Sequence, residues 1–253
     1  MKKFVFLVAC FLIAVRLFAQ DCTQYMYMQK NKTIEMTSFN NKGEANFKSV
    51  TKVSDVNTSN GVTTANVVSE TYDKNGKLLG TSNVAYKCDG GVMMMDMNMN
   101  MSAAQTSQQN TKIDFKIINK GFTEYPAGMK VGDHLKDATS QMESTMSNGM
   151  TVVTTIQITD RIVAAKETVT TTAGSWDCFK ITSKTTSSTT FKGAHADTIN
   201  SAMSTIDKLK AKFAKLGPKM SSNSSENTIW YVPGFGMVKY QGKTFVMELT
   251  AIK

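Results

Sequence analysis

The chain has 253 residues and a formal net charge of +9, with 29 Lys and Arg against 20 Asp and Glu. The basic residues do not cluster with aromatic residues in any segment, and no nucleic-acid-binding motif is present, so we expect no nucleic-acid partner. Beyond the N-terminus, no apolar stretch reaches the roughly 20 residues that a transmembrane helix needs. We therefore expect no transmembrane segment in the mature chain.

The N-terminus has the layout of a secretory signal peptide. Lys2 and Lys3 precede an apolar run at residues 4–15, and the small residue Ala19 stands where a signal peptidase would cut. The sequence therefore predicts an exported protein from which residues 1–19 are removed. We expect it in the periplasm, associated with the outer membrane, or outside the cell.

Cleavage would leave residues 20–253, which we expect to form a single β-rich domain with a net charge of +6. A lipoprotein signal is the alternative, because Leu-Val-Ala-Cys at residues 7–10 has the spelling of a lipobox. Too few apolar residues precede Cys10 to make a normal signal of that kind, so the cleavable signal peptide is the preferred interpretation.

Alternation of apolar and polar residues between turn sequences is the dominant pattern, and it predicts antiparallel strands. Asn-Asn-Lys-Gly at residues 40–43 and Asp-Lys-Asn-Gly at residues 73–76 are turn sequences, because Asn and Gly tolerate a positive φ. In the strand that follows the first turn, we expect Phe47, Val50 and Val53 to point inward.

Two later segments complete the predicted architecture. Residues 150–160 and 161–172, both rich in Val, Ile and Thr, are expected to form a hairpin. Apolar residues recur at helical spacing over residues 194–216, which predicts one inserted helix. The fold class is therefore all-β and mostly antiparallel, a curved meander sheet or half-barrel of about ten to twelve strands with one helix.

The mature chain keeps three cysteines, Cys22, Cys88 and Cys178. In an oxidising compartment two of them can pair, but the spacing does not say which two. No Cys-x-x-Cys motif or Cys/His pair is present, so we expect neither a zinc site nor thioredoxin-type chemistry, and we expect no cofactor.

Catalytic motifs are also absent. The two histidines, His134 and His195, fall in a connector and near the start of the expected helix, where surface positions are the simplest interpretation. No serine lies in a nucleophile motif, and no phosphate-binding loop is present. We therefore expect that the protein is not an enzyme and has no catalytic residues.

The one unusual stretch is rich in methionine. At strand spacing one face would carry these side chains: Met93, Met95, Met97, Met99 and Met101. Thioethers are soft ligands, so Cu(I) binding is one hypothesis. The alternatives are that methionine fills an apolar core or lines a cavity that takes a lipid-like ligand, since its side chain is flexible and polarizable.

Several segments together resemble the TapB-like family of exported bacterial proteins. These segments are Asp-Cys-Thr at 21–23, Tyr-Asp-Lys-Asn-Gly-Lys at 72–77, Cys-Asp-Gly-Gly at 88–91, Met-Lys-Val-Gly-Asp at 129–133, residues 167–178, Trp-Tyr at 230–231 and Gly-Phe-Gly-Met-Val at 234–238. The resemblance spans nearly the whole mature chain. It implies a curved sheet similar to the half-barrel of lipoprotein carriers such as LolA, within a larger domain-of-unknown-function group, and no catalytic residue.

The leading hypothesis for function is an envelope protein that binds a lipid-like or other apolar ligand in the groove of a half-barrel. The first alternative is a structural or protein-interaction module of the envelope that holds no small ligand. A lesser alternative is Cu(I) binding by the methionine run.

Overall fold

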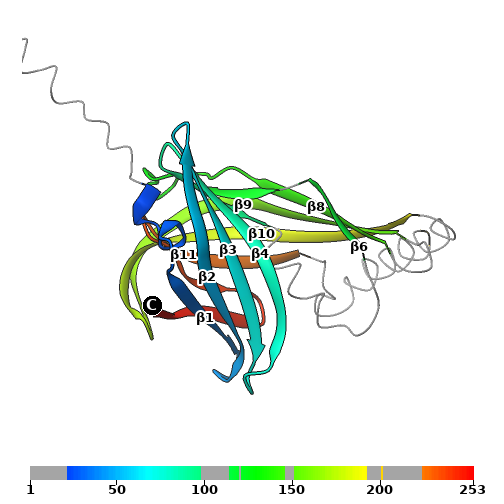
Figure 1. The fold of residues 1–253 in the computed structure, drawn as a ribbon, viewed down its shortest axis with the longest axis horizontal. Helices are drawn as coiled ribbons and strands as arrows, with labels where there is room; N and C mark the ends of the chain where they lie inside the picture. The colour runs from blue at the N-terminus through cyan, green and yellow to red at the C-terminus, as the bar shows by residue number, and fades with distance from the viewer. Residues whose placement is uncertain (1–21, 98–113, 120, 146–150, 193–200, 202–223) are drawn as a thin grey trace, which may run out of the picture.

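The structure is a computed structural model that describes residues 22–97, 114–119, 121–145, 151–192, 201 and 224–253. These residues form two short 3₁₀ turns, η1 (Cys22–Gln24) and η2 (Met26–Met28), followed by strands of a single antiparallel sheet (Figure 1). The strands are β1 (Thr33–Asn40), β2 (Ala45–Ser59), β3 (Val62–Asp73), β4 (Leu78–Asp89), β5 (Val92–Asp96), β6 (Asp114–Asn119), β7 (Phe122–Tyr125), β8 (Ala138–Thr145), β9 (Thr151–Thr171), β10 (Gly174–Lys192), β11 (Ser224–Val232), β12 (Gly236–Gln241) and β13 (Phe245–Ile252).

The sheet is curved and is not closed into a barrel, which confirms the predicted half-barrel. Its thirteen strands follow the order β6-β8-β9-β10-β11-β12-β13-β1-β2-β3-β4-β5-β7, one more strand than the expected range. The edge strands β6 and β7 are consecutive in the chain, so the polypeptide itself crosses from one edge to the other. The helix predicted at residues 194–216 lies, apart from Ser201, outside the described residues.

A buried arginine ties the β7 edge to β9. Arg161, which is 2% exposed, donates to the carbonyl oxygens of Lys136 at 2.6 Å and Glu124 at 3.0 Å. Its guanidinium carbon lies 5.0 Å from the centre of the Tyr125 ring. Because a guanidinium has several donors in a rigid plane, one side chain can satisfy two backbone segments at once. Arg161 thus links strands that are far apart in the sheet order.

The turn predicted at residues 73–76 is present between β3 and β4. Gly76 has a φ of 82°, and its N–H donates to the carbonyl oxygen of Asp73 at 3.0 Å. The Asp73 carboxylate accepts the backbone N–H groups of Asn75 and Lys77 at 2.9 and 2.8 Å. This carboxylate therefore stabilises the turn locally, as Asp commonly does.

The hairpin predicted over residues 150–172 is wrong. Instead, β9 continues through the expected turn as one strand of 21 residues, and its hairpin partner is β10. Asp160 has a φ of 53°, and the pairing between β9 and β10 shifts register nearby. A positive φ at this residue produces a bulge that bends a continuous strand, which from sequence alone looks like a turn.

The chain's own N-terminal segment packs into the hydrophobic core on the concave face. Residues 25–28 enter it as η2, and the side chains of Tyr25, Met26, Tyr27 and Met28 are only 0–4% exposed. A disulfide joins Cys22, just before this segment, to Cys88 on β4. We call residues 25–28 the N-terminal plug. The plug is anchored covalently at one end and hydrogen-bonded through the Met26 N–H to the Phe235 carbonyl oxygen at 3.0 Å.

Candidate functional site

An open groove of about 510 Å³ crosses β1, β2 and β3. Its lining residues are Thr37, Ala45, Phe47, Lys48, Val50, Lys52, Glu70, Tyr72, Asp73, Lys74 and Gly76. On β2, Lys48, Val50 and Lys52 alternate with positions whose side chains face the core, of which Thr51 and Val53 are buried. The groove therefore lies on the outer face of the sheet, opposite the N-terminal plug.

Placing Val50 in this groove corrects one prediction from the sequence. Of the three residues expected to point inward, Val53 is 2% exposed and lies in the core, whereas Val50 is only partly buried and lines the outer groove. Phe47 lies where the groove ends, near the turn between β3 and β4. Two residues three positions apart on a regular strand face opposite sides, so Val50 and Val53 cannot both point inward.

A row of directly paired residues runs across the sheet and ends in the groove. The backbone registers place Lys239 opposite Glu248, Glu248 opposite Thr37, Thr37 opposite Lys48, and Lys48 opposite Tyr72. Residues paired in this way lie on the same face and contact their neighbours. Lys239 and Glu248 form an ion pair at 2.7 Å at one end of the row, and the groove occupies the other end.

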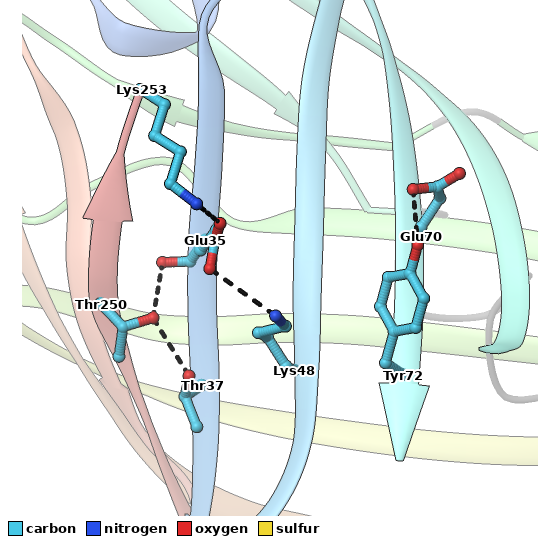
Figure 2. Close-up of polar contacts among 7 residues, drawn as sticks. All are labelled: Glu35, Thr37, Lys48, Glu70, Tyr72, Thr250 and Lys253. Atoms are coloured by element: carbon cyan, nitrogen blue, oxygen red, sulfur yellow. Dashed lines mark hydrogen bonds and ion pairs between the residues drawn. The ribbon is translucent and has the colours of Figure 1, made fainter. Parts of the chain in front are cut away.

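Glu70 and Tyr72 form the centre of the groove wall on β3. The Tyr72 hydroxyl donates to Glu70 Oε2 at 2.8 Å, and Lys52 Nζ lies 3.5 Å from the same oxygen (Figure 2 shows the Tyr72–Glu70 contact). The hydrogen bond from Tyr72 is the main cause that lowers the pKa of Glu70, and it raises the pKa of the Tyr72 hydroxyl. Glu70 is thus held as a carboxylate whose charge is already engaged by the protein.

Glu35, on β1, is likewise a carboxylate whose charge is engaged by protein groups. Its carboxylate binds Lys253 Nζ at 2.5 Å and lies 3.8 Å from Lys48 Nζ (Figure 2). The hydrogen bond from Lys253 is the main cause that lowers the pKa of Glu35. Beside it, the hydroxyls of Thr37 and Thr250 lie 3.0 Å apart and join β1 to β13.

The resulting surface has more available donors than acceptors. Glu70, Glu35 and Asp73 all accept from protein groups, whereas each lysine ammonium has three donors and uses few of them here. Lys48 Nζ also lies 5.9 Å from the centre of the Tyr72 ring. The groove can therefore offer charged hydrogen-bond donors beside an aromatic ring and the aliphatic side chain of Val50.

The methionine run is divided between the core and undescribed residues. Met93 is 1% exposed and pairs with Cys88 on β4 and Tyr125 on β7. Met95 packs against the core, and Met97 follows β5, where its N–H donates to Gly121 at 3.0 Å. Met99 and Met101 lie outside the described residues. For Met93 and Met95 the structure shows packing, and Cu(I) binding stays a prediction.

Groups with catalytic potential are placed apart. Cys178 is a free thiol that is fully buried, and burial raises its pKa to about 11. His134 is exposed in the connector between β7 and β8, and His195 lies outside the described residues. In the part of the chain that the structure describes, no three His, Cys, Asp or Glu side chains gather as a metal site, and no helix is long and apolar enough to cross a membrane.

The site that sequence reasoning missed is the groove itself. Its lysines alternate with Val50 along β2, but the neighbouring Tyr72 comes from the next strand, so the cluster appears only once the strands are paired. The one available sign was the Lys-x-Val-x-Lys pattern at residues 48–52, which presents two cations on one face of a strand.

Comparisons with known proteins agree with this architecture. The chain is similar in fold to the crystal structure of a "putative lipoprotein" from Parabacteroides distasonis, with a TM-score of 0.64 and 17% identity, covering 92% of this chain and 100% of that one. It is also similar to a "putative exported protein with YmcC-like fold" from Bacteroides fragilis, with a TM-score of 0.60 and 17% identity, covering 90% and 98%. No curated protein matches the sequence. Residues 29–205, more than two thirds of the chain, match the DUF3108-like family, and the protein belongs to that family.

Proposed function

We propose that the protein is an exported, non-enzymatic binding module of the bacterial cell envelope, and that it holds its ligand in the outer groove. The observation that carries this proposal is the open groove of about 510 Å³ with exposed lysines around Tyr72. Concave sites with a few convergent polar groups are where ligands usually bind. This proposal places the ligand in the outer groove and not inside the half-barrel, where the leading hypothesis placed a lipid-like ligand.

The N-terminal plug is the reason for that preference. A lipid-like ligand in the concave face would have to displace Tyr25, Met26, Tyr27 and Met28, which are nearly inaccessible to solvent. The disulfide between Cys22 and Cys88 keeps the segment close to its site even when it moves. Because displaced apolar side chains lose their burial energy, a lipid competes there against about 1.5–3 kcal/mol for each large side chain.

Export is supported by the signal-peptide layout and by the similarity in fold to the "putative lipoprotein" and the "putative exported protein" described above. We also propose that the protein is TapB-like and that it is located in the periplasm or at the outer membrane. The Cys22 sulfur is engaged in a disulfide, so a lipid anchor attached through a thioether would need Cys10 and the alternative signal. N-terminal sequencing of the exported protein distinguishes these cases, and we expect Gln20 as the first residue.

Photo-crosslinking in the native envelope tests the groove. We would place a benzoylphenylalanine at Tyr72 and, in a matched control, at Asn66, which lies on the same face of β3 roughly 20 Å away. The proposal predicts an adduct at position 72 and none at position 66. An exported protein that gives no adduct at position 72, or equal adducts at both positions, would overturn the proposal.

A further inference from the structure

The charge balance of the groove indicates the kind of ligand it takes. The side chains of Lys48 and Lys52 are 46% and 57% exposed, and Lys74 is exposed on the turn that closes the groove. The nearby carboxylates of Glu35 and Glu70 each accept from two protein groups, as described above. The donors left over belong to cations, so the groove is complementary to a ligand with anionic groups.

The position of the groove in the sheet argues against an extended peptide. It lies over β1, β2 and β3, and each of these strands is hydrogen-bonded on both sides. β1 pairs with β13 and β2, β2 pairs with β1 and β3, and β3 pairs with β2 and β4. No backbone donors or acceptors of these strands are therefore free to pair with an added strand, which is how sheets commonly bind peptides. Recognition here has to come from side chains.

The remaining features of the groove suit a sugar ring. The Tyr72 ring and the Val50 side chain supply apolar surface, and the Thr37 hydroxyl and the lysine ammoniums lie around them. A pyranose ring presents an apolar face of C–H groups with hydroxyls at its rim, so it can pack on an aromatic ring while the rim is hydrogen-bonded. An open groove also accepts a chain of such rings without enclosing its ends.

We propose that the outer groove binds an acidic oligosaccharide, with Lys48, Lys52 and Lys74 contacting its carboxylates and Tyr72 packing against a sugar ring. This proposal rests on the proposed function and names the ligand class of the same site. Lys48 and Lys52 lie four residues apart on β2, so their Cα atoms are separated by roughly 13 Å, and they can contact two acidic sugars of one chain that are not adjacent.

Calorimetric titration of the mature exported protein tests the assignment. The probes are an oligogalacturonate of four sugars, the same oligomer with its carboxylates methyl-esterified, and a tetraglutamate peptide. We expect binding of the acidic oligosaccharide and at least about tenfold weaker binding of the other two. The double variant Lys48→Gln/Lys52→Gln should weaken binding of the acidic oligosaccharide by about tenfold or more.

The matched control is Lys30→Gln/Lys192→Gln. These lysines are also exposed and form single ion pairs with Asp55 and Glu143, outside the groove. Equal losses in the control and groove variants, or unchanged affinity in the groove variant, would overturn the assignment, because the attraction would then be diffuse. Equal binding of the esterified oligomer or of the peptide would refute the acidic sugar. None of these results affects an adduct at position 72, so the proposed function is judged separately.

Discussion

The aromatic rings of Tyr27 and Tyr86 stack face to face, with centroids 4.3 Å apart and planes inclined by 4°. Tyr27 belongs to the N-terminal plug and Tyr86 to β4, so this pair joins the plug to the sheet. Both rings are almost inaccessible, at 2% and 0% exposure. We predict that Tyr27→Ala lowers the free energy of unfolding by about 3–5 kcal/mol, as removal of a buried aromatic ring does.

Urea unfolding followed by circular dichroism measures this change. Lys30→Ala is the control, because Lys30 is exposed and its ion pair with Asp55 at the surface contributes little. A double-mutant cycle with Leu at positions 27 and 86 should give a coupling of about 0.5–1.5 kcal/mol for the stacked pair. If Tyr27→Ala is as mild as the control, the plug does not occupy the core in solution.

The mature chain should expose no reactive thiol while it is folded and oxidised. Cys22 and Cys88 are joined, and Cys178 is buried with a pKa raised to about 11, so its thiolate is scarce at neutral pH. We expect alkylation to add no label to the native protein, one label after denaturation, and three after denaturation with reduction. Mass spectrometry counts the labels and locates them on peptides. Three labels on the denatured, unreduced protein would mean that no disulfide forms, and a single label on Cys22 or Cys88 in place of Cys178 would exclude this pairing.

Loss of the disulfide should also lower stability. A closed loop of 66 residues is expected to contribute about 4 kcal/mol through the entropy of the unfolded chain. We predict a decrease of that order in the Cys22→Ser/Cys88→Ser variant, with the wild-type protein under the same conditions as the reference. The readout is the urea midpoint, and an unchanged midpoint would mean that the bond does not constrain the unfolded state.

The sheet could be predicted from sequence because strand signals are local. Alternation and an Asn-Gly turn depend on neighbouring residues, and the turn at residues 73–76 forms as expected. The failures concern information from distant residues. Alternation alone shows that Val50 and Val53 cannot share a face, but it does not say which of the two is inward, because that depends on the face that the paired strands bury. The strand boundary predicted after residue 160 is a bulge at Asp160 within one continuous strand, and a bulge and a turn share a positive φ.

The interior and the groove could not be predicted for the same reason. The choice of Cys22 and Cys88 as partners depends on where the N-terminal segment packs, and those residues are 66 positions apart. Residues 25–28 show neither strand alternation nor a helical period, so no local pattern indicated that they pack into the core on the concave face. Likewise, Tyr72 and Lys48 become neighbours only through the register of β2 with β3.

A glycine at the junction of the two edge strands should be essential for packing. A Cβ atom added at Gly121 would lie 2.3 Å from the Thr139 carbonyl oxygen and 2.8 Å from Met97 Sδ. The first contact is with backbone, so Gly121→Ala has to shift β7 or β8, at a cost of about 1–3 kcal/mol or more. Gly128→Ala is the control, because nothing lies within 4 Å of its added Cβ. Thermal unfolding of both variants measures the difference, and equal melting temperatures would contradict the close approach.

Stability should fall at alkaline pH because of the buried tyrosines. Burial raises the pKa of Tyr27 to about 12 and also raises the pKa values of Tyr25, Tyr86 and Tyr231. A group whose pKa is higher in the folded state contributes stability that is fully present below its unfolded pKa, near 10, and is lost as pH rises through the folded value. We therefore expect the free energy of unfolding to decline from about pH 10 upward, by about 1.4 kcal/mol per pH unit for each such tyrosine.

Absorbance at 295 nm measures tyrosinate directly and gives the test. In urea the tyrosines should ionise together near pH 10, whereas in the native protein the ionisation of the buried set should be delayed until the protein unfolds. Lysines lose their charge in the same range, so a matched variant is needed to isolate the tyrosines. Tyr27→Phe keeps the ring that stacks on Tyr86 but removes the ionisable hydroxyl, and its stability should decline less steeply above pH 10. Identical alkaline slopes in the variant and the wild type would show that Tyr27 is hydrated in solution, and the plug would then have to be loosely held rather than packed.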